Sequence, residues 1–422
     1  MMSAARVVTV FMFAFLARAP WCGGAEEGSG FTFAVIGDHR NGLTVYEGII
    51  RKVLEIDPAL VIHTGDLVLN GADAAEWKAF TVASKPLVEH SPAPGLAGYL
   101  YPTIGNHELW PDGNRAHLAH YFEAFKTVPA NALYYSFDYG NSHFISLFFP
   151  EESDIVLNSA ELSAMLAWLE SDLQAASLNP VTKWKFVFFH ASMFSSTSRH
   201  GCSPMLHQSL IPILNTHKVD AVFNGHTHAY QRYGPLKYYD EDPEGVTYIV
   251  SAGCGSELYP LDRLDDANYP GCDAATGTHH VVRAAHVESS FHYVMIDVTD
   301  DRVSGVMHRE DGTVMDTFIV RGKLGFARGD INVDGRRNIA DVVCLLGNFF
   351  NAQDEMYRAL VARCPDAADA NDDGNLNISD AIRILGYLFA LTGPLPAPFD
   401  ACGVDPTSDD LDCRNFPPCE GL

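Results

Sequence analysis

The sequence predicts an α/β domain of layered sheets and helices, followed by a small α-helical module. Two features predict the domain: apolar runs without polar alternation, as in Phe31–Ile36, and helical patterns between them, as in Val45–Leu54. A third feature predicts the module, because the pattern breaks near residues 321–328 and an internal repeat with an offset of 39 residues follows. A chain of 422 residues is long enough for one large and one smaller domain.

The remaining elements are expected from the same two patterns. Further buried strands are expected at Leu60–His63, Tyr101–Ile104, Phe144–Phe149, Lys185–Phe189 and Ala221–Phe223, and helices at Ala160–Ala176 and Leu206–His217. Strands that alternate with helices are typical of an α/β layered domain. The later runs have no helices between them, which favours antiparallel pairing. These runs are Val246–Ser251, Tyr293–Val298 and Thr313–Val320.

The first 25 residues have the order of a secretory signal peptide. Arg6 precedes an apolar run over Val7–Leu16, and small residues end at Ala25. The run is too short to span a bilayer, and a buried strand is the alternative. We therefore expect an exported protein, secreted or periplasmic. We expect residues 26–321 to form the first domain, 322–328 a linker, 329–392 the repeats and 393–422 a Pro/Cys-rich tail.

The composition argues against two classes of partner. The chain has 53 acidic and 28 basic residues and a net charge of −25, which repels nucleic acid and anionic lipid. No later segment has the length and apolar character of a membrane helix. Removal of the signal peptide would leave eight cysteines, from Cys202 to Cys419, and an even number favours disulfides in an exported chain.

Polar side chains follow five of the expected strands at the point where each strand ends. In chain order they are Asp38, Asp66, Asn106 with His107, His190, and the pair His226 and His228. Ligands of α/β sheets gather at the carboxyl ends of strands, so these turns can meet at one place. Each residue taken singly fits a helix cap or a surface turn. All of them in this order indicate a metal centre instead, because oxygen and imidazole donors without cysteine suit Mn, Zn or Fe.

These turns resemble the motifs of the calcineurin-like metallophosphoesterase superfamily. The matching stretches are Gly37-Asp38, Gly65-Asp66, Gly105-Asn106-His107-Glu108, His190 and Gly225-His226-Thr227-His228. The extension Ala229-Tyr230-Gln231-Arg232 is most similar to the branch that contains purple acid phosphatases. The resemblance covers residues 31–320. It implies a layered β-sandwich flanked by helices that hydrolyses phosphate mono- or diesters.

The resemblance implies a role for each of these residues. Asp66 would bridge two transition-metal ions, which are Fe, Zn or Mn in this family. Asp38 and His228 would hold the first ion. Three residues would hold the second ion: Asn106, His190 and His226. His107 would lie beside the substrate as a general acid or stabilise the developing charge, while the two ions activate a water that attacks phosphorus.

The sequence departs from the family pattern at two positions. The superfamily usually has histidine two residues after the first aspartate, where this chain has Arg40, and the purple enzymes have tyrosine where it has Leu69. We expect the adjacent His39 to face away, because neighbouring side chains diverge in an extended segment. The first ion therefore lacks one protein ligand. Arg40 is either a clamp for phosphate oxygens or part of a salt bridge on the rim.

The C-terminal repeat has the spacing of the EF-hand calcium loop, with glycine at position 6. It predicts a small α-helical module with paired EF-hand-like loops and two calcium ions. The expected calcium ligands are Asp330, Asn332, Asp334, Arg336, Asn338 and Asp341 in the first loop, and Asp369, Asn371, Asp373, Asn375, Asn377 and Asp380 in the second. Arg336 and Asn375 would contribute backbone carbonyls. The alternative is a pair of Asp/Asn-rich turns.

The repeat also resembles type I dockerin modules, because aspartate occupies position 12 and no clear helix precedes each loop. Dockerins attach enzymes to cohesin modules, so the resemblance implies a cohesin-like or cell-surface partner. The pairs Ile339-Ala340 and Ile378-Ser379 depart from the Ser-Thr pairs typical of cellulosomal recognition. The complete prediction is a secreted, dinuclear phosphoesterase with a calcium-binding attachment module. The alternative is a catalytically weak phosphoesterase scaffold that acts as a binding protein.

Overall fold

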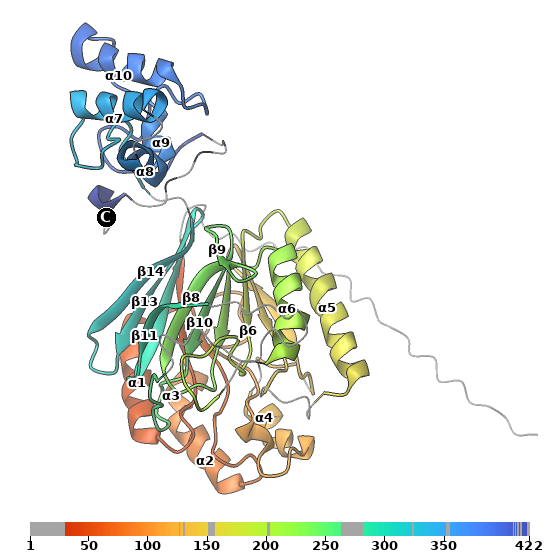
Figure 1. Ribbon diagram of the computed structural model, residues 1–422. Coiled ribbons are helices and arrows are strands. Elements are labelled where there is room, and N and C mark those ends of the chain that lie inside the picture. Colours follow the sequence, from red (N-terminus) through yellow and green to blue (C-terminus); the bar gives the residue numbers. More distant parts are fainter. Residues whose placement is uncertain are drawn as a thin grey trace, which may run out of the picture.

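The structure is a computed structural model of the chain. It describes residues 30–422 apart from 126, 130, 151–156, 201–202, 263–281, 323–324, 352–354, 408, 410, 412, 414–415 and 420–422. The expected signal peptide, Cys202 and part of the expected linker lie outside the described residues. Figure 1 shows two sheets flanked by helices and, apart from them, the group of C-terminal helices α7–α10.

The first sheet has six strands in the order β14-β13-β12-β1-β2-β3. Its strands are β1 (Phe31–Ile36), β2 (Leu60–His63), β3 (Leu100–Pro102), β12 (His292–Val298), β13 (Arg302–Arg309) and β14 (Val314–Gly322). Strands β1, β2 and β3 run parallel, whereas β12, β13 and β14 continue the sheet in antiparallel fashion. Strands β1 and β2 are almost entirely buried, in agreement with their apolar sequences.

The second sheet has the order β11-β8-β10-β7-β6-β5-β4, and β9 pairs with β8. Its strands are β4 (Tyr135–Tyr139), β5 (Ser142–Ser146), β6 (Trp184–Phe188), β7 (Ala221–Asn224), β8 (Tyr230–Lys237), β9 (Asp240–Glu241), β10 (Val246–Ser251) and β11 (Ala284–Glu288). Strands β5, β6, β7 and β10 run parallel, and the outer strands run antiparallel to their neighbours.

The two sheets pack face to face. The ring of Phe33 on β1 lies 5.3 Å from that of Phe144 on β5 and 5.7 Å from that of Phe223 on β7, measured between ring centroids. Aromatic pairs at such distances form the inner layer of a sandwich. The predicted layered α/β fold with flanking helices is therefore confirmed.

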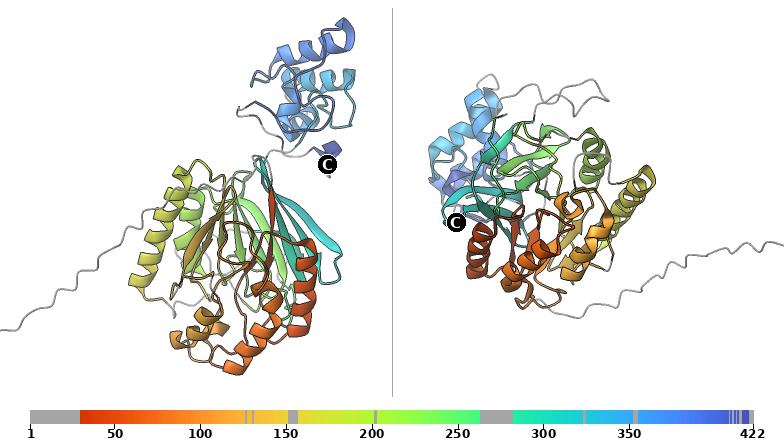
Figure 2. Two further views of the ribbon diagram at one scale, coloured as in Figure 1. Left: turned by 180° about the vertical axis from the view of Figure 1, so that it is seen from behind. Right: turned by 90° about the horizontal axis from the view of Figure 1, so that it is seen from below.

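Helices cover both outer faces of the sandwich (Figures 1 and 2). Helices α1–α4 lie beside the first sheet, and α5 and α6 lie beside the second. Their bounds, with the short 3₁₀ turns η1 and η2, are α1 (Leu43–Ile56), α2 (Ala74–Ala83), α3 (Lys85–Val88), η1 (His107–Leu109), η2 (Arg115–His117), α4 (Leu118–Ala124), α5 (Ser159–Leu178) and α6 (Pro204–Thr216).

The structure contains elements that the sequence patterns did not predict. Strands β4, β8, β11 and β13 and helices α2 and α4 are additional, and β3 is shorter than the expected Tyr101–Ile104. Strand β13 shows the reason, because its buried residues alternate with partly exposed ones. Such a strand has no continuous apolar run in its sequence. Across the described residues no helix has the length and apolar character to cross a membrane.

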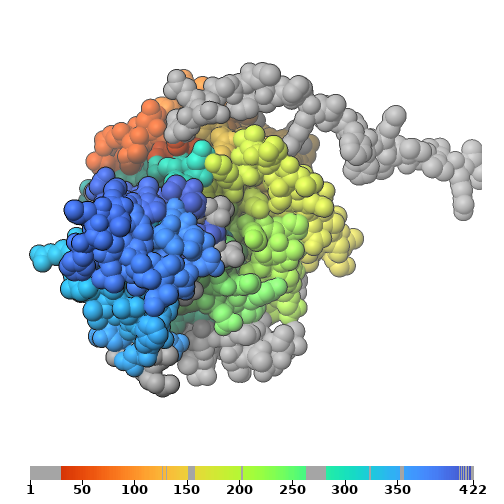
Figure 3. Space-filling view, turned by 90° about the horizontal axis from the view of Figure 1, so that it is seen from above, coloured from red at the N-terminus to blue at the C-terminus, as the bar shows by residue number. Residues whose placement is uncertain are grey.

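The C-terminal helices form a module with its own core. They are α7 (Ile339–Phe350), α8 (Glu355–Arg363), α9 (Pro365–Ala368) and α10 (Ile378–Ala390), with the turn η3 (Pro417–Cys419) in the tail. Leu345 and Ile384 are fully buried in this core. Figure 3 shows the residues of this module as one continuous group on the surface of the molecule.

Two disulfides tie the tail to this module and to itself. Cys364 pairs with Cys413, and Cys402 pairs with Cys419, which confirms the predicted disulfides for these four residues. Cys254 and Cys344 are buried free thiols. Such crosslinks suit a module with a small apolar core.

The module is attached at the end of the first sheet opposite to the carboxyl end of β1. Phe31, at the start of β1, pairs with Val298, and Arg302 just beyond that turn pairs with Gly322 at the end of β14. The chain therefore leaves the sheet beside the start of β1, whereas Ile36 lies at the other end. Figures 1 and 2 show the same arrangement from opposite sides.

Candidate metal centre

The predicted site residues follow the carboxyl ends of parallel strands in both sheets. Asp38 follows β1, Asp66 follows β2, and His226 follows β7. All three have left-handed backbone conformations, with φ of 58°, 57° and 71°. Such sharp turns redirect the chain at the strand end, so that the side chains point across the sheet edge rather than along it.

Glycines allow these loops to approach one another closely. A Cβ at Gly225 would lie 2.5 Å from Asp38 Oδ2, and one at Gly105 would lie inside van der Waals contact with Asp66 Oδ1. Only a residue without a side chain fits at these two positions. The glycines of the predicted motifs therefore have a packing role beside the carboxylates.

Glu108 holds two of the loops together, and the sequence analysis gave it no role. Its buried carboxylate accepts hydrogen bonds from the backbone N–H groups of Gly105 (2.6 Å), Asp66 (3.0 Å) and Leu67 (2.7 Å). The loop after β3 is thereby fixed to the loop after β2. Its position directly after the Asn-His pair is the only signal in the sequence that indicates this role.

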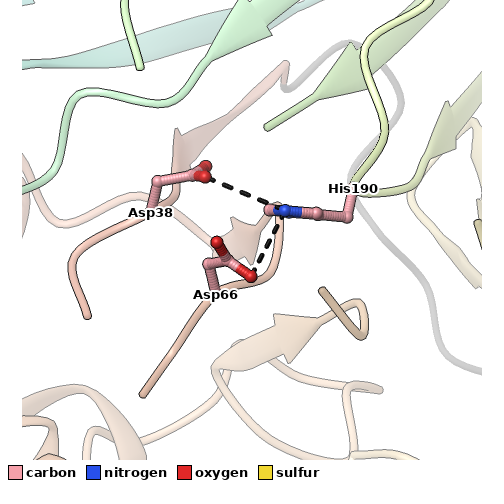
Figure 4. A group of neighbouring side chains, drawn as sticks. All are labelled: Asp38, Asp66 and His190. Carbon is pink, nitrogen blue, oxygen red and sulfur yellow. Dashed lines mark ion pairs between the residues drawn. The ribbon is translucent and has the colours of Figure 1, made fainter. Parts of the chain in front are cut away.

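Asp38, Asp66 and His190 form the centre of the site. Potential ligand atoms of these three residues all lie within 4.8 Å of one another. His190 Nε2 lies 3.3 Å from Asp66 Oδ1 and 3.9 Å from Asp38 Oδ1 (Figure 4). His190 donates from Nδ1 to the carbonyl of Thr64 at 2.7 Å, so its Nε2 lone pair faces the carboxylates.

Two further predicted ligands surround His190. Its Nε2 lies 3.1 Å from Asn106 Oδ1 and 3.2 Å from His226 Nδ1. One carboxylate oxygen, one amide oxygen and a second imidazole nitrogen therefore surround His190 Nε2 at 3.1 to 3.3 Å. A donor set of this composition suits a borderline divalent ion.

His228 and Arg40 lie on the other side of Asp66. His228 donates from Nδ1 to the carbonyl of Glu257 (2.6 Å), and its Nε2 lies 3.6 Å from Asp38 Oδ1. Arg40 donates from Nε to Asp66 Oδ2 (3.0 Å) and from Nη2 to His228 Nε2 (2.7 Å). The Arg40 side chain is only 15% exposed, so its ion pair lies inside the site and not on the rim.

Burial and charge strongly perturb the titration of this cluster. Burial raises the pKa of Asp38 to about 8, and Asp66 adds to that rise while His190 opposes it. Burial also acts to raise the pKa of Asp66, but His190 and Arg40 hold it well below its usual range. A divalent cation would favour the charged form of both carboxylates. Asp38 Oδ2, which is buried, has no hydrogen-bond partner among the described residues, and a cation would provide that contact.

His107 lies at the edge of the cluster. It donates from Nδ1 to the carbonyl of Leu69 at 2.6 Å, and its Nε2 lies 4.0 Å from Asp66 Oδ2. Its ring stacks against that of Trp110 with 5.9 Å between centroids. Nε2 is therefore directed toward the centre while the ring remains partly exposed, at 14%.

The structure shows the surroundings of the residues at the two positions that depart from the family pattern. His39 faces away, as expected, since it stacks on Tyr46 and its Nδ1 lies 3.1 Å from His63 Nε2. The side chain of Leu69 is partly exposed and offers no ligand atom. Tyr259, which the sequence patterns did not indicate, stacks on His228 with 4.1 Å between ring centroids, and His228 in turn contacts Arg40. No motif marks Tyr259, because it follows an irregular segment after β10.

Comparison with known proteins agrees with this arrangement. Residues 31–230 match the family described as calcineurin-like phosphoesterase. Over this part, just under half of its length, the chain is similar to calcineurin-like phosphoesterases. The domain is therefore of a kind found in hydrolases of phosphoric esters. For the purple acid phosphatase-like branch, a dinuclear transition-metal centre is implied, and Asp38, Asp66 and His190 fit such a centre.

Individual relatives of the phosphoesterase domain are acid phosphatases. Purple acid phosphatase 23 of Arabidopsis thaliana is 30% identical over 253 residues, which cover 53% of this chain and 52% of that protein. Acid phosphatase type 7 of Mus musculus is 27% identical over 296 residues, which cover 63% of this chain and 61% of that protein. The purple acid phosphatase of yellow lupin (Lupinus luteus) has the same fold, with a TM-score of 0.55 and 21% identity over 69% of this chain and 54% of that chain. The chain spans about half the length of the Arabidopsis protein.

The predicted calcium ligands lie in two loops with matching backbone conformations. Position 4 is left-handed in both loops, with φ of 61° at Val333 and 62° at Asp372, and both glycines at position 6 also have positive φ. In each loop the first aspartate accepts from the N–H groups at positions 5 and 6. The position-9 asparagines cap α7 and α10, and the position-12 aspartates accept the N–H groups of the same asparagines.

Proposed function

We propose that the chain is an exported, metal-dependent phosphoesterase that hydrolyses phosphate mono- or diesters. The observation that carries this proposal is the arrangement of Asp66, Asn106 and His226 around His190 Nε2, within the part of the chain that matches calcineurin-like phosphoesterases. Acid phosphatase relatives over about half their length support the same reaction class. Asp38 and His228 are the other two of the six residues that the sequence indicates as metal ligands.

Each of the remaining residues has a defined place in the reaction. A divalent cation held by these ligands would lower the pKa of a water and draw charge from the phosphoryl oxygens. The guanidinium of Arg40 would add a positive charge that stabilises the same phosphoryl oxygens. His107 presents Nε2 at the partly exposed edge, where it can pass a proton to the departing alcohol.

The proposed reaction balances with water as the only co-substrate. The water oxygen forms a bond to phosphorus, and the ester P–O bond breaks. The departing alkoxide takes a proton from Nε2 of a protonated His107, and the proton released by the water restores the imidazolium. The products are an alcohol and phosphate, or a phosphate monoester when the substrate is a diester.

Hydrolysis of an aryl phosphate tests the proposal. The protein supplied with Mn²⁺ or Zn²⁺ should be active, and Asn106→Ala should abolish activity because it removes a ligand without adding charge. Asn179→Ala is a suitable control, because Asn179 lies at the C-terminal end of α5, outside the cluster. Inactivity of the wild-type protein with every metal and ester tried would contradict the proposal and favour a binding protein on a phosphoesterase scaffold.

We propose that the C-terminal loops bind two calcium ions through the twelve residues predicted above. The matching conformations of the two loops support this role. Such a module, similar to a dockerin, would attach the enzyme to a cohesin-like or cell-surface partner. Pull-down from the native extracellular fraction, with calcium present and then chelated, tests attachment; capture that does not depend on calcium would contradict it.

A further inference from the structure

We infer that the centre holds one transition-metal ion and that the Arg40 guanidinium takes the place of the other. The inference rests on the proposed metal-dependent function and deepens it. The two oxygens of Asp66 face different partners: Oδ1 lies 3.3 Å from His190 Nε2, and Oδ2 lies 2.9 Å from Arg40 Nη2. Asp66 thus bridges the position of one ion and a guanidinium.

Arg40 occupies the donor atoms that a first ion would need. Its Nη2 group lies between Asp66 Oδ2 (2.9 Å) and His228 Nε2 (2.7 Å). The orientation of His228 is fixed by its bond to the carbonyl of Glu257, so the lone pair of Nε2 is directed at the guanidinium. A guanidinium has no lone pair to offer a metal, so at this position it excludes an ion and does not bind one.

The backbone holds Arg40 in this place. Its φ is +43°, and its N–H donates to the carbonyl of Asp66 at 3.2 Å. A non-glycine residue in this conformation is uncommon and is retained where surrounding contacts fix it. The position two residues after Asp38 is therefore built to direct its side chain across Asp66.

Tyr259 holds His228, the residue that contacts the guanidinium. Its ring stacks on His228 with 4.1 Å between ring centroids and an interplanar angle of 22°, on the same side of the site as Arg40. Its N–H donates to the carbonyl of His228 at 2.9 Å. Tyr259 is 6% exposed, so it closes this side of the site as a positioning residue.

The donor atoms that Arg40 does not contact are sufficient to hold one metal ion. The second position keeps all four of its proposed ligands. Asp38 belongs to the same compact group, because its ligand atom lies within 4.8 Å of those of Asp66 and His190. Leu69 stands where the purple enzymes have tyrosine, and Arg40 stands where the superfamily usually has histidine, and neither side chain offers a ligand. Around the first position the remaining candidate ligands are Asp38, His228 and the shared Asp66.

The consequence is a centre with one fixed and one exchangeable positive charge. The fixed charge cannot dissociate, because arginine stays protonated throughout the physiological range. Activity should therefore rise with metal in a single binding phase. A substrate phosphate would contact the ion on one side of Asp66 and the guanidinium on the other.

Metal counting tests the inference without reference to activity. Tag-free protein is saturated with calcium to occupy the C-terminal loops, loaded with Mn²⁺, desalted and analysed for manganese per chain. We expect one ion in the wild type and the electron paramagnetic resonance spectrum of isolated Mn²⁺. Arg40→His restores a ligand at this position and should bind two ions with a spin-coupled spectrum.

Arg321→His is the matched control for this substitution. Arg321 is also largely buried, at 12% exposure, and pairs with Asp220 at 3.0 Å at the other end of the sheet. It should keep one ion. Any wild-type stoichiometry other than one, or a folded Arg40→His variant that still binds a single ion, would overturn the inference. If Arg40→His does not fold, the number of manganese ions per wild-type chain and the wild-type electron paramagnetic resonance spectrum are sufficient to test the inference.

The inference and the proposed function fail in different ways. One isolated ion in a protein that hydrolyses no phosphate ester would support the inference and contradict the function. Two coupled ions in an active wild-type enzyme would support the function and overturn the inference.

Discussion

The carboxylate of Glu108 accepts a hydrogen bond from the backbone N–H of Asp66 at 3.0 Å, so the loop after β3 supports the proposed bridging carboxylate. The same carboxylate accepts from Gly105 and Leu67 and is completely buried. Asp66 therefore has a fixed position before any ion binds. Fixed ligands are a general requirement of metal centres, because supporting hydrogen bonds set the ligand geometry.

Glu108→Ala should destabilise the protein even without metal. It leaves several buried N–H groups without an acceptor, and such groups cost on the order of 1–3 kcal/mol each. We expect the free energy of unfolding to fall by about 3 kcal/mol in urea titrations with a metal chelator present. Glu244→Gln, at an exposed position, should have no effect. An unchanged unfolding midpoint for Glu108→Ala would refute this role.

His143 provides a prediction for stability against pH away from the metal centre. Its ring lies between Asp138 (2.6 Å) and Asp172 (2.8 Å) and is almost completely buried. Burial lowers the pKa of His143, but the hydrogen bonds to both aspartates outweigh it and raise the pKa to about 9. The folded state therefore binds the proton more tightly than the unfolded state.

This stabilisation should be complete below pH 6.5 and disappear as the pH rises through about 9. The measurement is the free energy of unfolding of wild type and His143→Gln at pH 6.5 and at pH 9.5. The advantage of the wild type should shrink by about 2–3 kcal/mol between the two values. Asp172→Asn should reduce the same pH dependence. An advantage that is equal at both pH values would contradict the prediction.

His107 should matter most for substrates with poor leaving groups. If it donates the proton to the departing alcohol, His107→Ala should lower kcat for an alkyl phosphate by roughly 10²- to 10⁴-fold. Nitrophenolate departs from a nitrophenyl phosphate without a proton, so kcat for that substrate should fall much less. His117→Ala is the control, because His117 pairs with Asp112 outside the cluster. Equal losses for both substrates would assign His107 to charge stabilisation instead.

The proposed ligands of the centre can be picked out from the sequence because each follows a strand end. Asp38 and Asp66 come directly after buried apolar runs, and the fold brings these ends together. The partners of those ligands were not predictable in this way. Tyr259 contacts His228 from an irregular segment that follows β10, and the bond of Arg40 to Asp66 depends on a left-handed backbone at Arg40. Contacts that depend on loop conformation have no periodic signal in the sequence.

The strands that the sequence predicts and those that it does not predict differ in how completely they are buried. Strands buried on both faces, such as β1 and β7, are continuous apolar runs and were predicted. Strand β13 has one partly exposed face, so polar residues interrupt its pattern. Phe326 and Arg328, assigned to a linker, are fully buried, since Phe326 pairs with Gly403 and Arg328 with Asp405. Isolated residues in a short segment do not reveal such long-range partners.

Calcium should stabilise the C-terminal module without changing phosphoesterase activity. The position-12 aspartates Asp341 and Asp380 are buried, and burial raises the pKa of each to about 6. A bound cation would offset the cost of these charges. Calcium at about 100 times Kd should add roughly 2.7 kcal/mol per bound ion to the stability of the module. Because the chain leaves the sheet at the end opposite to Ile36, activity should not respond.

The calcium prediction can be checked by calorimetry on the full chain and on the double variant Asp341→Ala with Asp380→Ala. The wild type should show a calcium-dependent rise in the Tm of one transition, and the double variant should lose that rise while it keeps activity on an aryl phosphate. Asp400→Ala, an exposed aspartate of the tail, should behave as the wild type does. A calcium-dependent shift that persists in the double variant would show that the ion binds elsewhere, because both loops would then lack the carboxylate that closes them.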